Sequence, residues 1–219
     1  MLRFLKKQTP KILHINRTFG NTAFTLLDVG AGNRSASKTK LIFPNCEYHG
    51  LDIVRDFNNE ESDFAAMHSF YELDLTLLNL DAIPDDYFDF IRMAHVIEHL
   101  HNGDLVLPAL IKKLKPRGYF YIEYPGEKSM HLPSMHGTLN FKDDPTHVRL
   151  YSVKEVSSIF ENSNCRVIES GTRRNKLFIL LTPFRLLAGL LSAKKLNANI
   201  FWDILGFAEF VFAQKKASK

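Results

Sequence analysis

Short apolar runs alternate along most of this chain with stretches that have helical periodicity. Such alternation is the βαβ pattern of a mostly parallel sheet. Strands are predicted over residues 24–29, 47–52, 70–73, 88–93, 119–124, 166–170 and 209–214. Helices are predicted over residues 35–42, 95–101, 104–114 and 153–162. The last of these follows Ser152 and has Glu155 in its first turn, which is a capping-box pattern.

Two segments have no place in this alternation. Residues 125–150 form a long connection rich in Pro, Gly, His and Asp, and such connections in compact domains tend to be lids or binding loops. Residues 172–205 form an apolar insert, expected to be helical, before the last strand. Because no repeat, low-complexity tract or Pro/Gly/Ser linker divides the chain, we expect residues 1–219 to form one domain.

Composition changes this picture little. The chain has 219 residues, of which 45% are hydrophobic and 24% charged, as in ordinary globular proteins. Its two cysteines, Cys46 and Cys165, cannot build a disulfide framework and do not have metal-ligand spacing. The first 20 residues lack an apolar run followed by a small-residue cleavage site. We therefore expect a cytoplasmic protein.

The net charge of +4 is unevenly distributed. Residues 1–20 carry five Lys/Arg and no Asp/Glu, and residues 172–219 carry nine Lys/Arg and two acidic residues. The body between them, residues 21–171, has 14 basic and 22 acidic residues. An acidic body argues against a nucleic-acid partner, whereas the basic ends suit an anionic partner such as the inner membrane surface.

The strongest local signal is LLDVGAGNR, residues 26–34, where an apolar strand ends in an acidic residue before two glycines. Gly30 and Gly32 have no side chain, so a ligand can lie against the backbone. The second strand ends at Asp52, where a carboxylate can accept hydrogen bonds from both hydroxyls of a ribose. A third acidic residue, Asp74, follows the third strand.

Together these residues resemble the class I S-adenosylmethionine-dependent methyltransferases, over residues 24–171 and the last strand. The resemblance implies a Rossmann-like three-layer α/β sandwich, with a seven-stranded, mostly parallel sheet and an antiparallel last strand. It also implies an enzyme whose cofactor is S-adenosyl-L-methionine. The implied cofactor-binding residues are Asp28, Gly30, Ala31, Gly32, Asp52, Ile53, Asp74, Leu75, Met93 and His95.

Further along, FDFIRMAHVIEHL, residues 88–100, looks like the HVxEHL stretch of small-molecule members of this family. His95 either contacts the cofactor or acceptor, or starts the helix over 95–101, while Glu98 and His99 are expected to be structural. One departure is Asn33, where many members have a third glycine. A nicotinamide-dependent dehydrogenase is the nearest rival, but it requires a glycine where this chain has Ser35.

Methyl transfer from a sulfonium is an in-line displacement that needs a base when the acceptor is protonated. The connection 125–150 follows the fifth strand and should emerge beside the cofactor. Within it we predict His147 as general base, with Asp144 orienting it, and Asp144 and His131 as substrate-binding residues. The alternative is a turn in which Asp143 or Asp144 caps backbone groups and His147 lies at the surface. A metal bound by Asp143, Asp144 and His147 is the least favoured reading, and no metal is expected.

The insert contains LFILLTPFRLLAGLL, residues 177–191, which is too short and too interrupted to span a bilayer. With Lys194-Lys195 and Trp202 nearby, it suits helices that lie in a membrane interface. The insert could equally cover the active site as a lid, belong to the core, or form a homodimer interface.

These patterns lead us to expect methyl transfer to a small-molecule, sugar or lipid-type acceptor, at an oxygen atom. The alternative is a module that binds S-adenosylmethionine or its demethylated product without catalysis and recruits a partner. Peripheral membrane contact through residues 1–20 and 177–205 is compatible with either reading.

Overall fold

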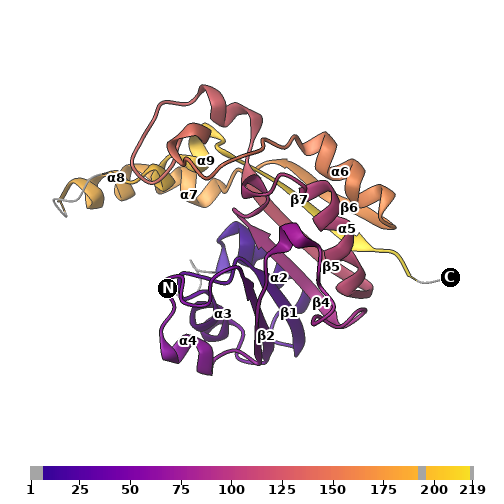
Figure 1. Cartoon of the computed structure of the whole chain (residues 1–219). Helices are drawn as coiled ribbons and strands as arrows, with labels where there is room; N and C mark the ends of the chain where they lie inside the picture. The colour runs from indigo at the N-terminus through magenta and orange to yellow at the C-terminus, as the bar shows by residue number, and fades with distance from the viewer. Residues whose placement is uncertain (1–6, 192–195, 218–219) are drawn as a thin grey trace.

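A seven-stranded sheet with the strand order β3-β2-β1-β4-β5-β7-β6 lies at the centre of the computed structural model, which describes residues 7–191 and 196–217. The strands from β3 to β5 are parallel to their neighbours, and β7 runs antiparallel to both β5 and β6. The strands are β1 Phe24–Val29, β2 Cys46–Asp52, β3 Ser69–Glu72, β4 Phe88–Ala94, β5 Leu114–Pro125, β6 Cys165–Thr172 and β7 Ala208–Lys215. The predicted fold, including its reversed last strand, is confirmed (Figure 1).

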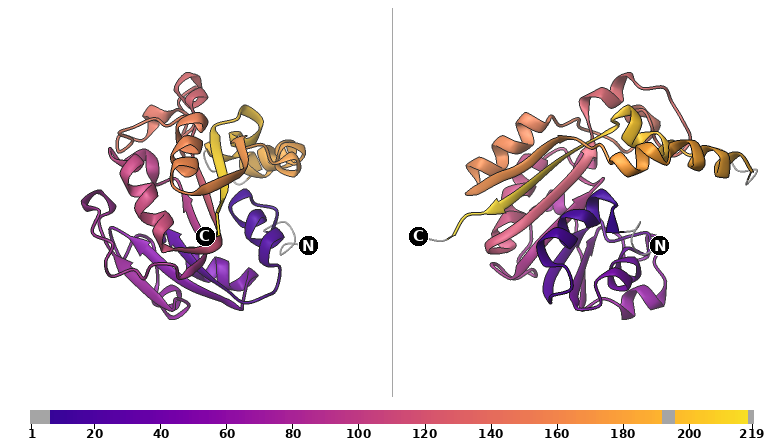
Figure 2. Two further views of the ribbon diagram at one scale, coloured as in Figure 1. Left: turned by 90° about the vertical axis from the view of Figure 1, so that its right-hand side faces the viewer. Right: turned by 180° about the vertical axis from the view of Figure 1, so that it is seen from behind.

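Helices cover both faces of this sheet (Figure 2). One face carries α2 Pro10–Phe19, α3 Ser35–Ile42 and α4 Glu61–Ala65, and the other carries α5 Gly103–Lys113 and α6 Val153–Asn162. Between β6 and β7 lie α7 Lys176–Leu180, α8 Thr182–Leu191, η5 Ala198–Ile200 and α9 Trp202–Leu205. Four further 3-10 turns are η1 Leu75–Leu77, η2 Ile97–His99, η3 Glu127–His131 and η4 Phe141–Asp143.

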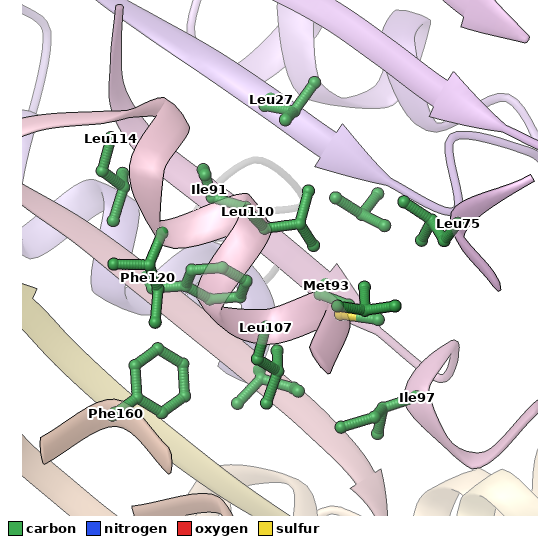
Figure 3. Packing of buried hydrophobic residues seen from close by; sticks show 14 of the residues in the cluster. Leu27, Leu75, Ile91, Met93, Ile97, Leu107, Leu110, Leu114, Phe120 and Phe160 are labelled. Atoms are coloured by element: carbon green, nitrogen blue, oxygen red, sulfur yellow. The ribbon is translucent and has the colours of Figure 1, made fainter. Parts of the chain in front are cut away.

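Each face of the sheet has its own hydrophobic core, because successive residues of a strand point to opposite faces. Leu27 and Ile91 pack with residues of α5 and α6 in the cluster shown in Figure 3. Their chain neighbours Leu26 and Phe90 pack on the other face, with residues of α2 and α3. The strand prediction succeeded because a sheet covered on both faces has strands that appear in the amino-acid sequence as short apolar runs.

The prediction of a helix over residues 95–101 is wrong. His95 has a φ of 58° and donates its backbone N–H to the carbonyl of Glu123 at 2.8 Å. A right-handed helix requires negative φ, so this segment contains only the three-residue turn η2, and α5 begins at Gly103. Helix α6, by contrast, begins as predicted, because Ser152 Oγ accepts the backbone N–H of Glu155.

Helix α2 has no counterpart among the predicted helices. It begins with Pro10, which suits the first helical position, and it buries Ile12 and Ile15 against the sheet. The His14 ring is also buried and lies 5.0 Å from the ring of Tyr121, centroid to centroid. Burial lowers the pKa of His14 from 6.5 to about 4, with the charge of Arg17 acting in the same direction.

We expect His14 to make the stability of the protein pH-dependent. Because the folded state holds its imidazole neutral, the unfolded chain takes up a proton first as the pH falls from 6.5 towards 4. The free energy of unfolding should therefore decrease over this window, and His14→Phe should remove that part of the decrease. Urea unfolding at about pH 7 and about pH 4.5 measures this, with the exposed His101→Phe as control. A pH dependence unchanged by His14→Phe would contradict the assignment.

A buried ion pair joins the central strands β1 and β4. Arg92 Nε and Nη2 donate to the two carboxylate oxygens of Asp28 at 2.7 and 2.5 Å. Tyr48 Oη and Ser35 Oγ donate to the same carboxylate at 2.5 and 2.6 Å. Burial disfavours the charged carboxylate, but Arg92 and these hydrogen bonds outweigh it and hold the pKa of Asp28 below its usual value. The pair thus ties together β1, β2, β4 and the start of α3.

Breaking this pair should be strongly destabilising. Arg92→Leu leaves the Asp28 carboxylate buried without its cation, which is expected to lower the free energy of unfolding by about 3–5 kcal/mol. Arg166→Leu on the exposed side of β6 should change it by less than about 0.5 kcal/mol. The double substitution Asp28→Asn/Arg92→Leu should recover part of the loss, because no unpaired charge remains. Equal urea midpoints for Arg92→Leu and Arg166→Leu would contradict the proposed role.

Candidate cofactor and acceptor site

The segments predicted to bind the cofactor leave the sheet at one edge. In the parallel registers Asp28 pairs with Gly50 of β2 and with Arg92 of β4, and Asp52 pairs with Glu72 of β3. The carboxyl ends of these neighbouring strands therefore lie side by side, which is where ligands bind in open α/β sheets.

The glycine loop after β1 passes close to its neighbours. A Cβ added at Gly30, which has a φ of 80°, would lie 2.5 Å from Val96 Cγ2, and one added at Gly32 would lie 2.6 Å from the Phe57 ring. The backbone N–H groups of Gly30 and Ala31 donate to the Leu51 carbonyl at 2.8 and 3.1 Å. Side chains at either glycine would push the loop away from β2 and β4.

Asn33 stands where many family members have a third glycine, and it adopts a backbone conformation typical of glycine. Its φ is 56°, in the left-handed region that asparagine adopts more readily than most residues. Its N–H donates to the Phe57 carbonyl at 2.8 Å, and Asn58 Nδ2 donates to its Oδ1 at 2.9 Å. The loop is thereby fastened to the segment after β2.

Asp28 uses both of its carboxylate oxygens inside the protein, on Arg92, Ser35 and Tyr48. Its predicted contact with the methionine part of the cofactor therefore stays a prediction. Arg92 Nη1, however, is buried and has no hydrogen-bond partner among the described residues. This site thus keeps one unpaired cationic donor, which suits an anionic group such as a carboxylate.

At the end of β2, a carboxylate and an apolar side chain stand next to each other in solvent contact. Asp52 is half-buried, and its Oδ1 accepts the N–H of Ile53 at 2.8 Å. The surrounding protein raises the pKa of Asp52 by desolvation, while Ile53 is 60% exposed. A hydrogen-bond acceptor beside an apolar surface fits a sugar and its attached base.

Three other predicted cofactor residues have roles inside the protein. Asp74 Oδ1 accepts from Thr76 N at 2.9 Å and from Thr76 Oγ1 at 2.6 Å, so it caps η1. Leu75 and Met93 are buried in the core cluster of Figure 3. Their predicted contacts with the adenine and the sulfonium stay predictions.

His95, at the end of β4, lies between two carboxylates. Its Nδ1 is 3.2 Å from Glu98 Oε1, and its Nε2 is 3.2 Å from Glu123 Oε1. Glu123 also accepts from Arg173 Nη1 at 2.8 Å and from Tyr121 Oη at 2.5 Å. Burial would lower the pKa of His95, but the hydrogen bonds that its ring donates to Glu123 and Glu98 outweigh burial and raise the pKa to about 9. At neutral pH His95 is therefore a cation and a hydrogen-bond donor.

The insert covers this histidine. The Trp202 ring lies 5.0 Å from the His95 ring, and Trp202 Nε1 donates to the Thr138 carbonyl at 2.9 Å. Arg173 links the insert to β5, because its Nη2 donates to Asp203 Oδ2 at 3.0 Å. The sequence reasoning missed Glu123, Arg173 and Asp203, whose only signal was charge within apolar stretches.

The connection after β5 buries His147. Its side chain is 4% exposed, and its Nε2 lies 3.9 Å from Asp144 Oδ2. Its Nδ1 lies 2.7 Å from the Phe141 carbonyl. Asp144 Oδ1 accepts from Thr146 N and Oγ1 at 2.9 and 2.5 Å, so Asp144 caps a turn as the alternative reading supposed. His147 itself is not a surface histidine.

Two neighbours complete this connection. Asp143 Oδ2 accepts the backbone N–H groups of Met135, Leu139 and Asn140, at 2.8 to 3.0 Å. Burial would raise its pKa, but these hydrogen bonds lower it to about 2. Asp143 therefore shapes the loop, whereas His131, on η3, is exposed to solvent.

Comparison with known proteins identifies the family. A methyltransferase domain family matches residues 1–170, and no curated protein matches the chain. An S-adenosylmethionine-dependent methyltransferase from Mesorhizobium loti superposes with a TM-score of 0.67 at 14% identity, covering 96% of this chain and 100% of that one. One from Archaeoglobus fulgidus gives 0.59 at 19% identity, covering 98% and 95%.

A third similar structure is phosphoethanolamine N-methyltransferase 2 of Haemonchus contortus, in complex with phosphomonomethylethanolamine and S-adenosylhomocysteine. It has a TM-score of 0.64 and 19% identity, and the match covers 95% of this chain and 52% of that one. The family match extends over more than half of the chain, and the fold agrees with it. The chain therefore belongs to the methyltransferase domain family, and its fold is that of S-adenosylmethionine-dependent methyltransferases.

Proposed function

We propose that this enzyme transfers the methyl group of S-adenosylmethionine to an oxygen atom of a small-molecule, sugar or lipid-type acceptor. The observation that carries the proposal is the shared edge where the glycine loop, Asp52 and His95 follow three strands of the sheet. In the reaction the methyl–sulfur bond breaks with its electron pair going to sulfur. A methyl–oxygen bond forms, and the acceptor hydroxyl gives up its proton.

The donor half of the site fits the cofactor piece by piece. Asp52 would accept hydrogen bonds from the ribose hydroxyls, and the exposed side chain of Ile53 would lie against the base. The unpaired Nη1 of Arg92 would face the methionyl carboxylate. Lys11 of α2 adds a second cation near this site, where the charge of Arg92 lowers its pKa and the charges of Asp28 and Glu123 raise it.

The acceptor half is proposed around His147, with Asp144 and His131 as binding residues. A carbonyl oxygen only accepts hydrogen bonds, so the 2.7 Å contact with Phe141 places the proton on His147 Nδ1. Its Nε2 then offers a lone pair, as removal of a hydroxyl proton requires. His95, with its pKa raised to about 9, is a poor base at neutral pH.

Cofactor binding tests the first half. We expect the wild-type chain to bind S-adenosylhomocysteine in calorimetry and Asp52→Ala to bind it at least about tenfold more weakly, because hydrogen bonds to a charged group are lost. Asp81→Ala removes an exposed carboxylate elsewhere and should keep wild-type affinity. Absence of binding by folded wild-type protein would refute the function, and equal affinities of the two variants would refute the role of Asp52.

The second part of the proposal is that α7 and α8 lie in the interface of an anionic membrane. Leu180, Phe184, Leu187 and Leu191 are 56–77% exposed. Their spacing of four, three and four residues places them on one side of a helix. The Arg185 N–H donates to the Leu181 carbonyl, so helical bonding continues from α7 into α8.

The surroundings of this stripe favour a lipid surface. Figures 1 and 2 show α8 projecting away from the sheet. Residues 172–202 contain six Lys/Arg and no Asp/Glu, which repels a second copy of the same segment but attracts anionic headgroups. In the described part of the chain no helix is long and apolar enough to cross a membrane.

The predicted contact through residues 1–20 loses support, because α2 buries its apolar side on the sheet. Residues 1–6 and 192–195 of the two predicted contact segments lie outside the described residues.

Cosedimentation with vesicles tests the membrane contact. We expect the wild-type chain to pellet with vesicles of mixed anionic and neutral phospholipid, and a Phe184→Ser/Leu187→Ser variant to stay mainly in the supernatant. Leu41→Ser, which removes an equally exposed leucine on α3, should pellet like wild type. Wild-type protein that does not pellet with anionic vesicles at low salt would refute the membrane contact. A dimer that dissociates in the double variant would assign the stripe to a second copy instead.

A further inference from the structure

A cluster of metal-ligating side chains lies next to His95. Glu98 and His99 belong to η2, and His147 belongs to the connection after β5. One ring nitrogen of each histidine and one carboxylate oxygen of Glu98 lie within 4.8 Å of one another. The connection is fastened there by the backbone N–H groups of Val148 and Arg149, which donate to the Glu98 carbonyl at 2.9 and 3.2 Å.

In both histidines Nδ1 contacts the protein, so a neutral ring would offer its Nε2 to an ion. The Nδ1–H of His147 is committed to the Phe141 carbonyl. His99 Nδ1 lies 2.9 Å from Thr146 Oγ1 and 3.2 Å from the Thr146 carbonyl. Because Thr146 Oγ1 donates its own proton to Asp144, it accepts from His99. Metal-binding histidines are held in this way, with the second nitrogen donating to the protein.

Glu98 supplies the observation that points to a ligand. The residue is 1% exposed, and its Oε1 contacts His95 at 3.2 Å. Its Oε2 is buried and has no hydrogen-bond partner among the described residues. An unpaired carboxylate oxygen is costly in a protein interior, and a bound cation would satisfy it.

A second cluster provides a contrast. Glu47, His49 and His68 also bring three ligand atoms within 4.8 Å. There, however, His49 Nδ1 contacts Ser69 Oγ at 2.6 Å and its Nε2 contacts Glu47 Oε1 at 3.0 Å. Both nitrogens of His49 already have partners, so this cluster is a hydrogen-bond network rather than an open ligand set.

We propose that Glu98, His99 and His147 bind one divalent transition-metal ion at the acceptor side of the active site. Two imidazoles and one carboxylate favour zinc, cobalt or iron over magnesium and calcium, which prefer oxygen ligands. Metal–ligand distances of about 2.0–2.2 Å require the three side chains to move inward by roughly 1 Å. The inference replaces the expectations that the site holds no metal and that Glu98 and His99 are structural.

The ion deepens the proposed function, on which its catalytic role rests. Three protein ligands leave a coordination position for the oxygen atom of the acceptor. Binding to the ion lowers the pKa of a hydroxyl group, so the proton leaves to solvent and the oxygen attacks the methyl carbon. In this form of the reaction His147 holds the ion instead of taking the proton itself.

Metal titration of the full chain tests the site. Protein freed of metal by a chelator and then dialysed should take up one equivalent of Co²⁺, with a visible absorption band that Zn²⁺ abolishes. His99→Ala and His147→Ala should each weaken Co²⁺ binding by at least about tenfold. His136→Ala removes an exposed imidazole of the same connection and should bind Co²⁺ like wild type. Glu98→Gln keeps the size of the side chain and should also weaken binding, which covers the case that a histidine variant fails to fold.

Calorimetry with S-adenosylhomocysteine on the same samples separates the two hypotheses. Metal-free wild type should still bind this ligand, since the donor half contains none of the three ligands. Binding of the ligand without stoichiometric Co²⁺ uptake would overturn the metal site and leave the methyl-transfer proposal intact. Co²⁺ uptake without binding of S-adenosylhomocysteine would refute the methyl-transfer proposal and leave the metal site intact. Equal Co²⁺ affinities of wild type, His147→Ala and Glu98→Gln would also overturn the metal site.

Discussion

The carboxylate of Asp28 and the guanidinium of Arg92 meet in the interior between β1 and β4, 64 residues apart in the chain. A charge at this depth is tolerated only when it is paired and hydrogen-bonded. Ser35 and Tyr48 supply the remaining bonds, so the ends of β1, β2, β4 and the start of α3 are held in one arrangement. The glycine loop lies among these ends, and its shape depends on that arrangement.

A second polar network organises the acceptor side. His95 is held by Glu98 and Glu123, and Glu123 is held by Arg173, which also binds Asp203 of the insert. The donor half of the site is thus built from consecutive strands and their turns. The proposed acceptor half is built from the two long connections on either side of β6. This division explains why one fold can keep its cofactor while its acceptors differ.

The insert connects two features that would otherwise be unrelated. Its α9 carries Trp202, which covers His95, while its α7 and α8 carry the exposed apolar stripe. Because one segment contains both, a protein held at a lipid surface through α8 would keep its acceptor side close to that surface. Among the proposed acceptor classes, that position would favour a lipid-type acceptor.

The amino-acid sequence alone determined the features that depend on near neighbours. Short apolar runs identified the strands, Ser152 marked the start of α6, and the loop from Asp28 to Gly32 with Asp52 indicated the cofactor. Tertiary structure decided the rest. Only in the folded chain does α2 pack on the sheet and His95 adopt a non-helical φ. The same holds for the pairing of Asp28 with Arg92 and for the contact between His99 and His147. Those outcomes depend on strand order and on the paths of long connections, and contacts between residues 28 to 107 positions apart leave no periodic trace in the chain.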